Sequence, residues 1–398
     1  MLKKIKVQKI EIQTLILVFI VFLAGCSNIP GIQFGSNKNE KPDINVGFDG
    51  LKMEFFPNAP PPNVFQQTNF PVGIKIKNSG AYDIGYDKNG NENNLMAILV
   101  LGVERDYNCV SDFDDTNNAK AVGNKNIDNT NKDNQKINCP MSQKPSEEKV
   151  DIRMLGKSET NPKGTEENLL YTVETKALDP QSEQHSSSLY ATLCYPYQTR
   201  FITTTCVDTD VLGARYKRKV CSSKDYDFAN GQGAPVAVTR VESRMLQKDD
   251  SNNKIIIPNF IIYVENKGGG QVIRNSANKM ENIEKFCSGA RLDPTDKDFN
   301  TISVKVYLSS ESKENQLDCE PKAPDNDNQK DDSINSIKKQ GYVRLVDKKD
   351  LIRCSLPPET KRIDKSIEPY TTPLIVVMEY GYTTSISKDY LVQRSVVN

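Results

Sequence analysis

Two short patterns occur once in each half of this 398-residue chain, and they constrain its fold more than any other feature of the sequence. A strand-like run ends in Asn-x-Gly at Asn78 and again at Asn266, 188 positions later. An apolar run leads into Tyr-x-Tyr at Tyr195 and again at Tyr380, 185 positions later. Because the two offsets agree closely, the sequence predicts an internal repeat whose boundary lies near Gly213.

Most of the other apolar runs are short and typical of β-strands. They alternate apolar and polar residues, or they are continuous like strands that are buried on both faces. Only residues 276–286 and 348–354 have a helical pattern. The sequence therefore predicts an all-β protein in which short strands joined by turns form sandwiches. The strand-like runs are residues 72–77, 96–103, 169–175, 255–264, 302–308 and 374–380.

The strand that ends in Asn-x-Gly also resembles CARDB-type modules, the cell-adhesion-related domains of bacterial and archaeal surface proteins. The resemblance covers about a quarter of each half. Those modules are immunoglobulin-like, so it implies two tandem immunoglobulin-like β-sandwich domains, which we place at residues 45–212 and 213–398. Each contains an insertion rich in Asn, Asp and Lys, at 111–149 and 309–340, which is expected to be a solvated loop.

The N-terminus has the order of an export signal. Four lysines among the first nine residues precede an apolar run at 14–22 and two small residues, which predicts a signal peptide over residues 1–25. Residues 23–26, Leu-Ala-Gly-Cys, resemble a prokaryotic lipobox, which implies a diacylglycerol on Cys26. Such a lipid would anchor the protein, because each buried CH₂ contributes ~0.8 kcal/mol. An uncleaved membrane helix is the alternative. Either way, the polar residues 26–44 are expected to form a flexible tether outside the membrane.

The cysteine count indicates a disulfide framework. The chain has 9 cysteines, and setting aside Cys26 leaves an even number in a chain that is sent to an oxidising compartment. They divide equally between the two predicted domains. No Cys-x-x-Cys spacing occurs, so nothing supports a zinc ribbon or a thioredoxin-like site. The cysteines are Cys109, Cys139, Cys194 and Cys206 in the first domain, and Cys221, Cys287, Cys319 and Cys354 in the second.

In the first domain two pairings are expected. Cys109 lies at a strand end and is the obvious partner for Cys139 in the polar insertion. Cys194 and Cys206 are evenly spaced about a hairpin centred near Arg200, where they would face each other on one side of the sheet.

In the second domain two alternatives remain open. Cys319 lies in the polar insertion and is expected to bond either Cys287 or Cys354. Cys221 then takes the remaining cysteine. Because four cysteines allow three pairings in each domain, all these pairings are hypotheses.

Signatures of catalysis are missing from the sequence. The single histidine, His185, lies in a polar stretch without a His partner for a triad or a typical zinc site, so we interpret it as an exposed loop residue. No Gly-x-Ser-x-Gly elbow occurs, and the glycines at 268–270 follow a strand without opening a helix, as a phosphate-binding loop would require. We therefore expect no enzymatic activity and no cofactor.

Two clusters of acidic residues are candidates for calcium loops, because oxygen ligands at close spacing suit this cation. Residues 225–231 miss the EF-hand register by one position, and neither they nor residues 112–115 offer a bidentate Glu at the right distance. Both are interpreted as solvated turns, and no metal site is predicted.

The aromatic residues supply a candidate binding patch. The rings of each Tyr-x-Tyr project from the same face of a strand, where they would either form an exposed patch or pack within the sandwich. Residues 55–62, Phe-Phe followed by a proline-rich segment, are a second candidate for recognition. The tyrosines of the possible patch are Tyr195, Tyr197, Tyr380 and Tyr382.

These features predict a non-enzymatic, membrane-anchored extracytoplasmic protein for adhesion, scaffolding or assembly of a surface complex, with a protein partner in the envelope. Lys plus Arg and Asp plus Glu number 52 each, so no net charge would attract nucleic acid. One alternative is an envelope enzyme or substrate-binding accessory with a carboxylate-lined cleft between the domains. Another is a rod stiffened by calcium.

Overall fold

The computed structural model describes residues 44–114, 149–215, 218–250, 253–275, 280–287, 297–322, 339–359 and 361–395. The predicted export signal, the lipid site at Cys26 and the tether as far as residue 43 lie outside these ranges, as do residues 115–148 and 323–338 of the two polar insertions. Residues Asp43–Asn398 belong to one compact unit.

The regular secondary structure of the described residues is almost entirely β-strand, so the prediction of an all-β protein is confirmed. The first half forms β1 (Leu51–Phe55), β2 (Asn63–Phe65), β3 (Asn69–Asn78), β4 (Ala97–Val103), β5 (Asn108–Asp114), β6 (Lys149–Ile152), β7 (Glu166–Thr175) and β8 (Gln184–Val207). The second half forms β9 (Tyr226–Asp227), β10 (Val236–Asp250), β11 (Asn253–Asn266), β12 (Gln271–Ile273), the helix α2 (Met280–Cys287), β13 (Thr301–Leu308), the short helix η2 (Lys313–Asn315), β14 (Asp318–Glu320), β15 (Gly341–Arg344), β16 (Lys349–Ser355), β17 (Ile363–Asp364) and β18 (Tyr370–Gln393).

One of the two predicted helices is wrong. Residues 348–354 fall almost entirely in the strand β16, which lies between β11 and β14 and forms a ladder with each. Ile352 and Cys354 are buried while Arg353 between them is exposed, which is the period of a strand. Pairing on both edges therefore overrides a weak local helical pattern. The other predicted helix overlaps α2.

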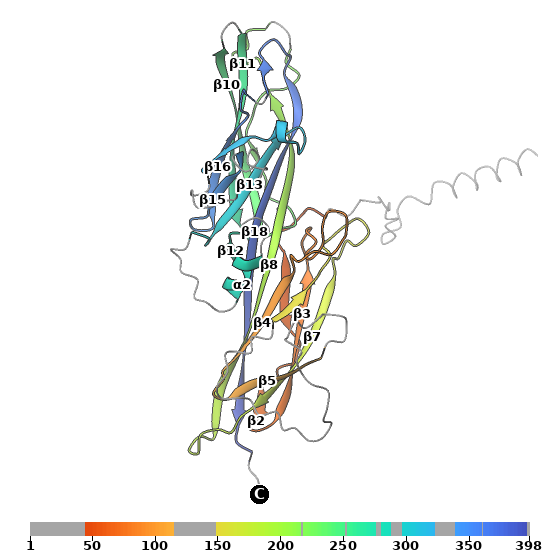
Figure 1. The fold of residues 1–398 in the computed structure, drawn as a ribbon, viewed down its shortest axis with the longest axis vertical. Coiled ribbons are helices and arrows are strands. Elements are labelled where there is room, and N and C mark those ends of the chain that lie inside the picture. Colours follow the sequence, from red (N-terminus) through yellow and green to blue (C-terminus); the bar gives the residue numbers. More distant parts are fainter. Residues whose placement is uncertain are drawn as a thin grey trace, which may run out of the picture. The chain divides into compact units, whose positions relative to one another are not determined.

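The strands form three largely antiparallel sheets (Figure 1). An eight-stranded sheet has the order β15-β13-β18-β8-β4-β6, with β12 and β2 also paired to β18. A four-stranded sheet has the order β1-β3-β7-β5, and a six-stranded sheet has the order β14-β16-β11-β10-β9 with β17 paired to β11. The four-stranded sheet packs on the eight-stranded one, as the 5.0 Å between the rings of Phe70 and Tyr390 shows, and we call this pair of layers the first sandwich. The six-stranded sheet also packs on it, with Phe201 and Phe228 4.7 Å apart, and this pair is the second sandwich.

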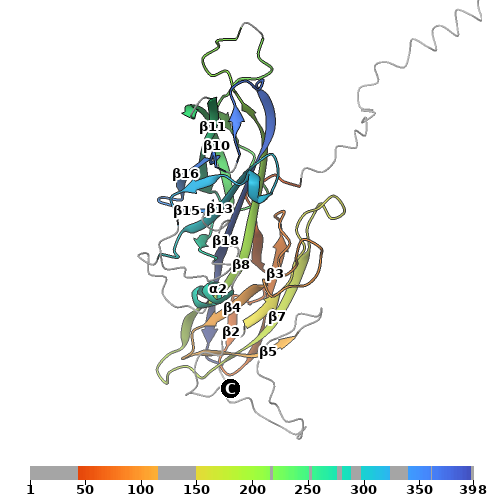
Figure 2. The same ribbon diagram turned by 45° about the horizontal axis from the view of Figure 1, so that its top comes forward.

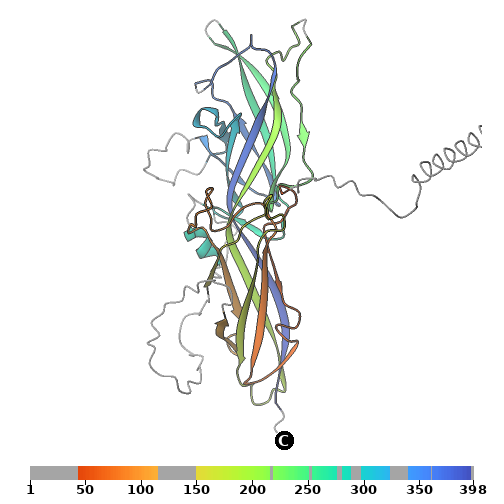
Figure 3. The ribbon, with the colours of Figure 1, turned by 90° about the vertical axis from the view of Figure 1, so that its right-hand side faces the viewer.

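Two long strands belong to both sandwiches (Figure 3). β8 and β18 are 24 residues each and pair with one another along their entire length. β4 pairs with β8 only over residues 189–194, and β13 pairs with β18 only over residues 374–379. Each sandwich therefore includes part of a strand from the other half of the chain, so the predicted domains 45–212 and 213–398 are joined by a continuous ladder and not only by a linker.

The sequence repeat corresponds to a repeat of topology. The order β1-β3-β7-β5 in the first half matches β10-β11-β16-β14 in the second, and β8-β4-β6 matches β18-β13-β15. The centre of this correspondence lies where Pro196 pairs with Gly381. Those two positions are 185 apart in the sequence, as are Tyr195 and Tyr380.

An apolar core extends through all three sheets. In β3, for example, Val72, Ile74 and Ile76 are fully buried, and each such side chain contributes about 1.5–3 kcal/mol relative to an exposed one. A smaller cluster lies where α2 covers β4 and β8 (Figure 2). Its buried members are Ile98, Cys194, Ile283 and Cys287.

Three disulfides connect described cysteines, and two expected pairings are wrong, that of Cys194 with Cys206 and that of Cys221 with the cysteine left over in the second domain. Cys194 and Cys206 do not bond each other, because β8 continues without a hairpin at Arg200 and twelve residues of strand separate them by about 40 Å. Each bonds a cysteine of the second half instead, so the expectation that the pairs stay within one predicted domain is also wrong. The disulfides are Cys194–Cys287, Cys206–Cys221 and Cys319–Cys354.

The bond between Cys319 and Cys354 is one of the two alternatives expected for Cys319. Cys109 is also disulfide-bonded, while its expected partner Cys139 lies outside the described residues. Disulfides persist in oxidising compartments, so the folded unit belongs outside the cytoplasm. No helix in the described ranges is both long and apolar enough to cross a membrane.

Candidate binding groove at the tyrosine junction

The four tyrosines of the repeat meet at the centre of the molecule, where β8 and β18 pass from one sandwich to the other. The ring of Tyr195 lies 5.7 Å from that of Tyr382, and the ring of Tyr197 lies 6.0 Å from that of Tyr380. All four are 3% exposed or less. They are therefore core residues, and the interpretation of these tyrosines as a surface binding patch is wrong. Packing within the sandwich is the other interpretation that the pattern allowed.

Buried hydroxyls need hydrogen-bond partners, and two of these hydroxyls find equivalent ones. The backbone N–H of Leu51, at the start of β1, donates to Tyr195 Oη at 3.1 Å. The backbone N–H of Val236, at the start of β10, donates to Tyr380 Oη at 3.3 Å. The first tyrosine of each pattern thus fixes the first residue of the corresponding edge strand.

The second tyrosine of each pattern contacts the Asn-x-Gly turn. A Cβ added at Gly80 would lie 1.7 Å from Tyr197 Oη, and one added at Gly268 would lie 2.2 Å from Tyr382 Oη. Neither glycine has a positive φ, so glycine is required here for close approach and not for a left-handed turn.

The asparagines of these turns organise the backbone in the same way in both halves. Asn78 Oδ1 accepts from Gly80 N, and Asn266 Oδ1 accepts from Gly268 N, both at 3.1 Å. The amide of Asn266 also donates to Gly270 O at 2.9 Å. The two repeated sequence patterns are therefore in contact with each other in the folded chain.

The hydroxyls of the junction remain protonated. Burial raises the pKa of Tyr195, Tyr197 and Tyr380 well above the usual value, and it raises the pKa of Tyr382 to about 12. Each hydroxyl can therefore donate as well as accept, as Tyr197 Oη does toward Gly233 O at 2.9 Å.

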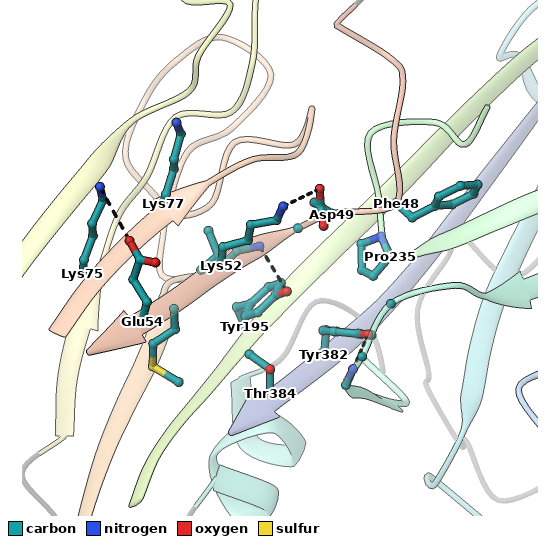
Figure 4. A pocket seen from close by; sticks show the side chains of 16 residues that line it. Phe48, Asp49, Lys52, Glu54, Lys75, Lys77, Tyr195, Pro235, Tyr382 and Thr384 are labelled. Atoms are coloured by element: carbon teal, nitrogen blue, oxygen red, sulfur yellow. Dashed lines mark hydrogen bonds and ion pairs between the residues drawn. The ribbon is translucent and has the colours of Figure 1, made fainter. Parts of the chain in front are cut away.

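A groove of about 480 Å³ opens beside this junction (Figure 4). One wall is the edge strand β1 with the residues before it, and Lys75 and Lys77 of β3 stand behind it. The other wall is the glycine turn at 268–270 with Thr384 of β18. Tyr195, Tyr382 and Pro235 also line it.

The charges of the groove come from β1 and β3. Lys52 Nζ lies 2.9 Å from Asp49 Oδ2, and Lys75 Nζ lies 3.0 Å from Glu166 and 3.7 Å from Glu54. Lys77 is the direct cross-strand partner of Lys52, and it forms no ion pair within the described part of the chain.

The groove does not have the features expected of a carboxylate-lined catalytic cleft. Its carboxylates are Asp49 and Glu54, whose side chains are 45% and 69% exposed. Each is paired with a lysine, and they are not a convergent, buried acid pair.

A second hollow, of about 520 Å³, lies beside β8 in the second sandwich. Its walls are Arg200, Phe201 and Ile202 on β8 and the segment 227–232 that follows β9. Asn45 completes it. The hollow lies at the edge where the second sandwich is closed by β9.

The aspartates of the candidate calcium loop at 225–231 are paired with arginines. Asp225 lies 2.5 Å from Arg244 and 3.2 Å from Arg240, and Asp227 lies 3.3 Å from Arg240. These arginines hold the pKa of Asp225 below its usual value. The side chains of residues 112–115 lie outside the description. Where side chains are described, no group of three or more His, Cys, Asp or Glu residues is placed to hold a metal ion.

The sequence reasoning missed a polar cluster around the single histidine. His185 lies in β8, stacked 3.8 Å from the ring of Tyr107, and its Nε2 is 2.9 Å from Glu104 Oε2. The hydroxyl of Ser187 donates to the same carboxylate oxygen at 2.9 Å and itself accepts from the Asn108 amide at 2.8 Å. Both His185 and Ser187 contact the carboxylate, so the histidine does not connect the serine to an acid as in a catalytic triad. No spacing in the sequence indicates this cluster.

No protein-family model matches this chain, and no curated protein matches it. A solved structure named BspA_C_mut aligns with 87% of this chain and 97% of its own length, at 6% identity and a TM-score of 0.18. A likeness at that level carries no argument about fold or function.

Proposed function

We propose that this is a non-enzymatic, membrane-anchored extracytoplasmic protein that binds a partner in the cell envelope for adhesion, scaffolding or assembly of a surface complex. The observation that carries the proposal is the groove beside β1. It combines a strand edge that no described strand pairs with and a frame fixed by buried tyrosines, and its acidic groups are already paired with lysines. Such a site suits binding better than chemistry.

The anchor is tested by fractionation. Replacing the proposed lipid-bearing residue, C26S, should move the full-length chain from the membrane fraction to the soluble one, because the lipid can no longer be attached. The neighbouring variant S27A is the matched control and should remain in the membrane fraction. Retention of C26S in the membrane would support the uncleaved helix instead.

Binding at the groove is tested in the cells that make the protein. A photo-crosslinking amino acid at Glu54, which is exposed at the groove, should form adducts with an envelope protein. The same amino acid at Asn89, exposed in a loop and not part of the groove, is the control. The proposal is wrong if neither position gives an adduct, or if both capture the same proteins equally.

A further inference from the structure

One edge of β1 has backbone groups that point away from its sheet. The bonds from Phe56 N to Gly73 O and from Ser79 N to Gly50 O show that the even-numbered residues of this strand bond to β3. Leu51, Met53 and Phe55 therefore direct their N–H and C=O groups to the opposite side. The N–H of Leu51 is taken by Tyr195, while both groups of Met53 have no partner among the described residues.

The equivalent edge in the second half carries an added strand. β10 corresponds to β1, because Val236 pairs with Asn266 as Leu51 pairs with Asn78. On β10 the outer edge is occupied by β9, which places Asp227 beside Arg240 and its neighbour beside Val241. The outer edge of β10 thus accepts a short antiparallel strand at Arg240 and Val241, just beyond a bulge. The backbone groups of Val238, which corresponds to Met53, are bonded to the side chain of Gln232 instead.

The side chains of β9 show which contacts hold it on the outer edge of β10. The acidic residues that flank Tyr226, at 225 and 227, ion-pair with the outward Arg240 of the edge strand, at 3.2 and 3.3 Å. The ring between them lies against the sandwich, partly buried. A segment with the order acid, aromatic, acid thus neutralises an arginine of β10 on one face of the sheet and places its ring on the other face.

The outward face of β1 and β3 carries two lysines side by side, although Glu166 of β7 lies opposite the second of them on its other side, where it bonds to Lys75. Lys52 and Lys77 are directly opposite each other, an arrangement of like charges that destabilises a sheet. Asp49 compensates only Lys52, whose side chain is 59% exposed. A carboxylate on a strand added at this edge would lie next to Lys52 and within reach of the long side chain of Lys77.

Space for such a strand is present. The groove runs along residues 48–54, and a Cβ added at Gly269 in its opposite wall would meet no atom within 4 Å. A volume of about 480 Å³ lies within the range of natural ligand sites.

We infer that the free edge of β1 binds an extended segment of another polypeptide, which adds to the four-stranded sheet as a further strand. Because side chains alternate along a strand, the segment has an acidic residue beside Lys52 and, next to it, an apolar residue beside Met53. This inference rests on the proposed binding function and names the ligand class of its groove.

The test uses a library of random twelve-residue peptides displayed on phage, selected against the purified full-length chain in detergent. Peptides with an acidic residue next to an apolar one in an otherwise alternating sequence should be enriched. M53P removes the outward N–H without breaking a bond to β3, so it should weaken binding of the selected peptides by about tenfold. M53V keeps that N–H and is the matched control.

The variant K52E supplies a second measurement that does not depend on M53P folding normally. It should change the selected residue beside position 52 from acidic to basic. No enrichment, or selected peptides that bind M53P and K52E as they bind the wild-type chain, would overturn the inference. The proposed function fails separately, when crosslinking at Glu54 captures no envelope protein.

Discussion

The contact between the Asn-x-Gly turn and the second tyrosine makes Gly80 the position where one added methyl group should be most costly. In G80A the new Cβ would lie 1.7 Å from Tyr197 Oη and 2.7 Å from the backbone oxygens of Asp49 and Gly233. Rotating the tyrosine alone cannot relieve this clash, because two of the three contacts are with backbone. Strain in a filled core costs about 1–3 kcal/mol. Displacing the hydroxyl also breaks its bond to Gly233 O, which is worth about 0.5–1.5 kcal/mol.

The expected loss of unfolding free energy in G80A is therefore about 2–4 kcal/mol. It is measured by urea titration of the wild type and the variant under oxidising conditions. G268A should lose a similar amount, because its Cβ would lie 2.2 Å from Tyr382 Oη and 2.8 Å from Pro235 Cβ. G269A is the matched control, since its Cβ meets nothing within 4 Å. A G80A variant no less stable than G269A would refute the close-packing explanation of the repeated motif.

Three further predictions concern the junction, the disulfides and the acidic turn. Above pH 10 the unfolded chain loses its tyrosine protons while Tyr382, with a pKa of about 12, keeps its own. The contribution of this raised pKa to the free energy of unfolding is therefore complete below pH 10 and is lost as the pH rises toward 12. The Tm of Y382F should decrease less steeply with pH in this range than that of the wild type. An equally steep decrease would contradict this. Replacing Cys194 and Cys287 together by Ser should lower the unfolding free energy in urea by about 2–4 kcal/mol, and equal stability would show that the bond contributes nothing. Because Asp225 and Asp227 are paired with arginines, EDTA should leave the Tm unchanged, whereas a decrease of several degrees would indicate a bound cation.

The parts of this fold that could be predicted from the sequence are those fixed by local pattern. Residues 72–77 and 255–264 alternate or continue as strands, and both are strands in the structure. The repeat is visible because each half needs the same contact between a tyrosine and a glycine. The strands are predictable because their patterns depend only on side-chain period. The repeat is recognisable because its motifs occur twice, although the contact they make, such as that of Gly80 with Tyr197, joins residues far apart in the chain.

The parts that could not be predicted depend on partners distant in sequence. The even spacing of Cys194 and Cys206 about Arg200 suggested a hairpin, but β8 continues through this position. Its polar residues there are tolerated because alternate positions face solvent while Tyr197 and Phe201 face the core. The partner of Cys194 is 93 residues away, and only the packing of α2 on β8 brings Cys287 to it. Tyrosine occurs both in protein cores and on surfaces, so the Tyr-x-Tyr pattern could not distinguish an exposed patch from a buried junction.

The centre of the repeat explains how one ladder can serve two sandwiches. A proline is normally excluded from a central strand because it lacks an N–H. Pro196 lies two residues beyond the end of the β4 ladder, where β8 has only β18 as a paired neighbour. The N–H that proline lacks is therefore not missed in a hydrogen bond to β4. Opposite it, Gly381 permits Ile283 of α2 to approach to 3.0 Å of where a Cβ would be.

The two halves are thus alike in topology and differ where the edges of their sheets are covered. β9 covers β10, while α2 packs at the centre on β8 and β4, and nothing in the described chain pairs with the outer edge of β1. If the two sandwiches were identical, the outer edges of β1 and β10 would both be covered or both be free. The uncovered edge is the one beside the groove and the adjacent lysines Lys52 and Lys77, so the departure from symmetry coincides with the surface on which we propose that a partner binds.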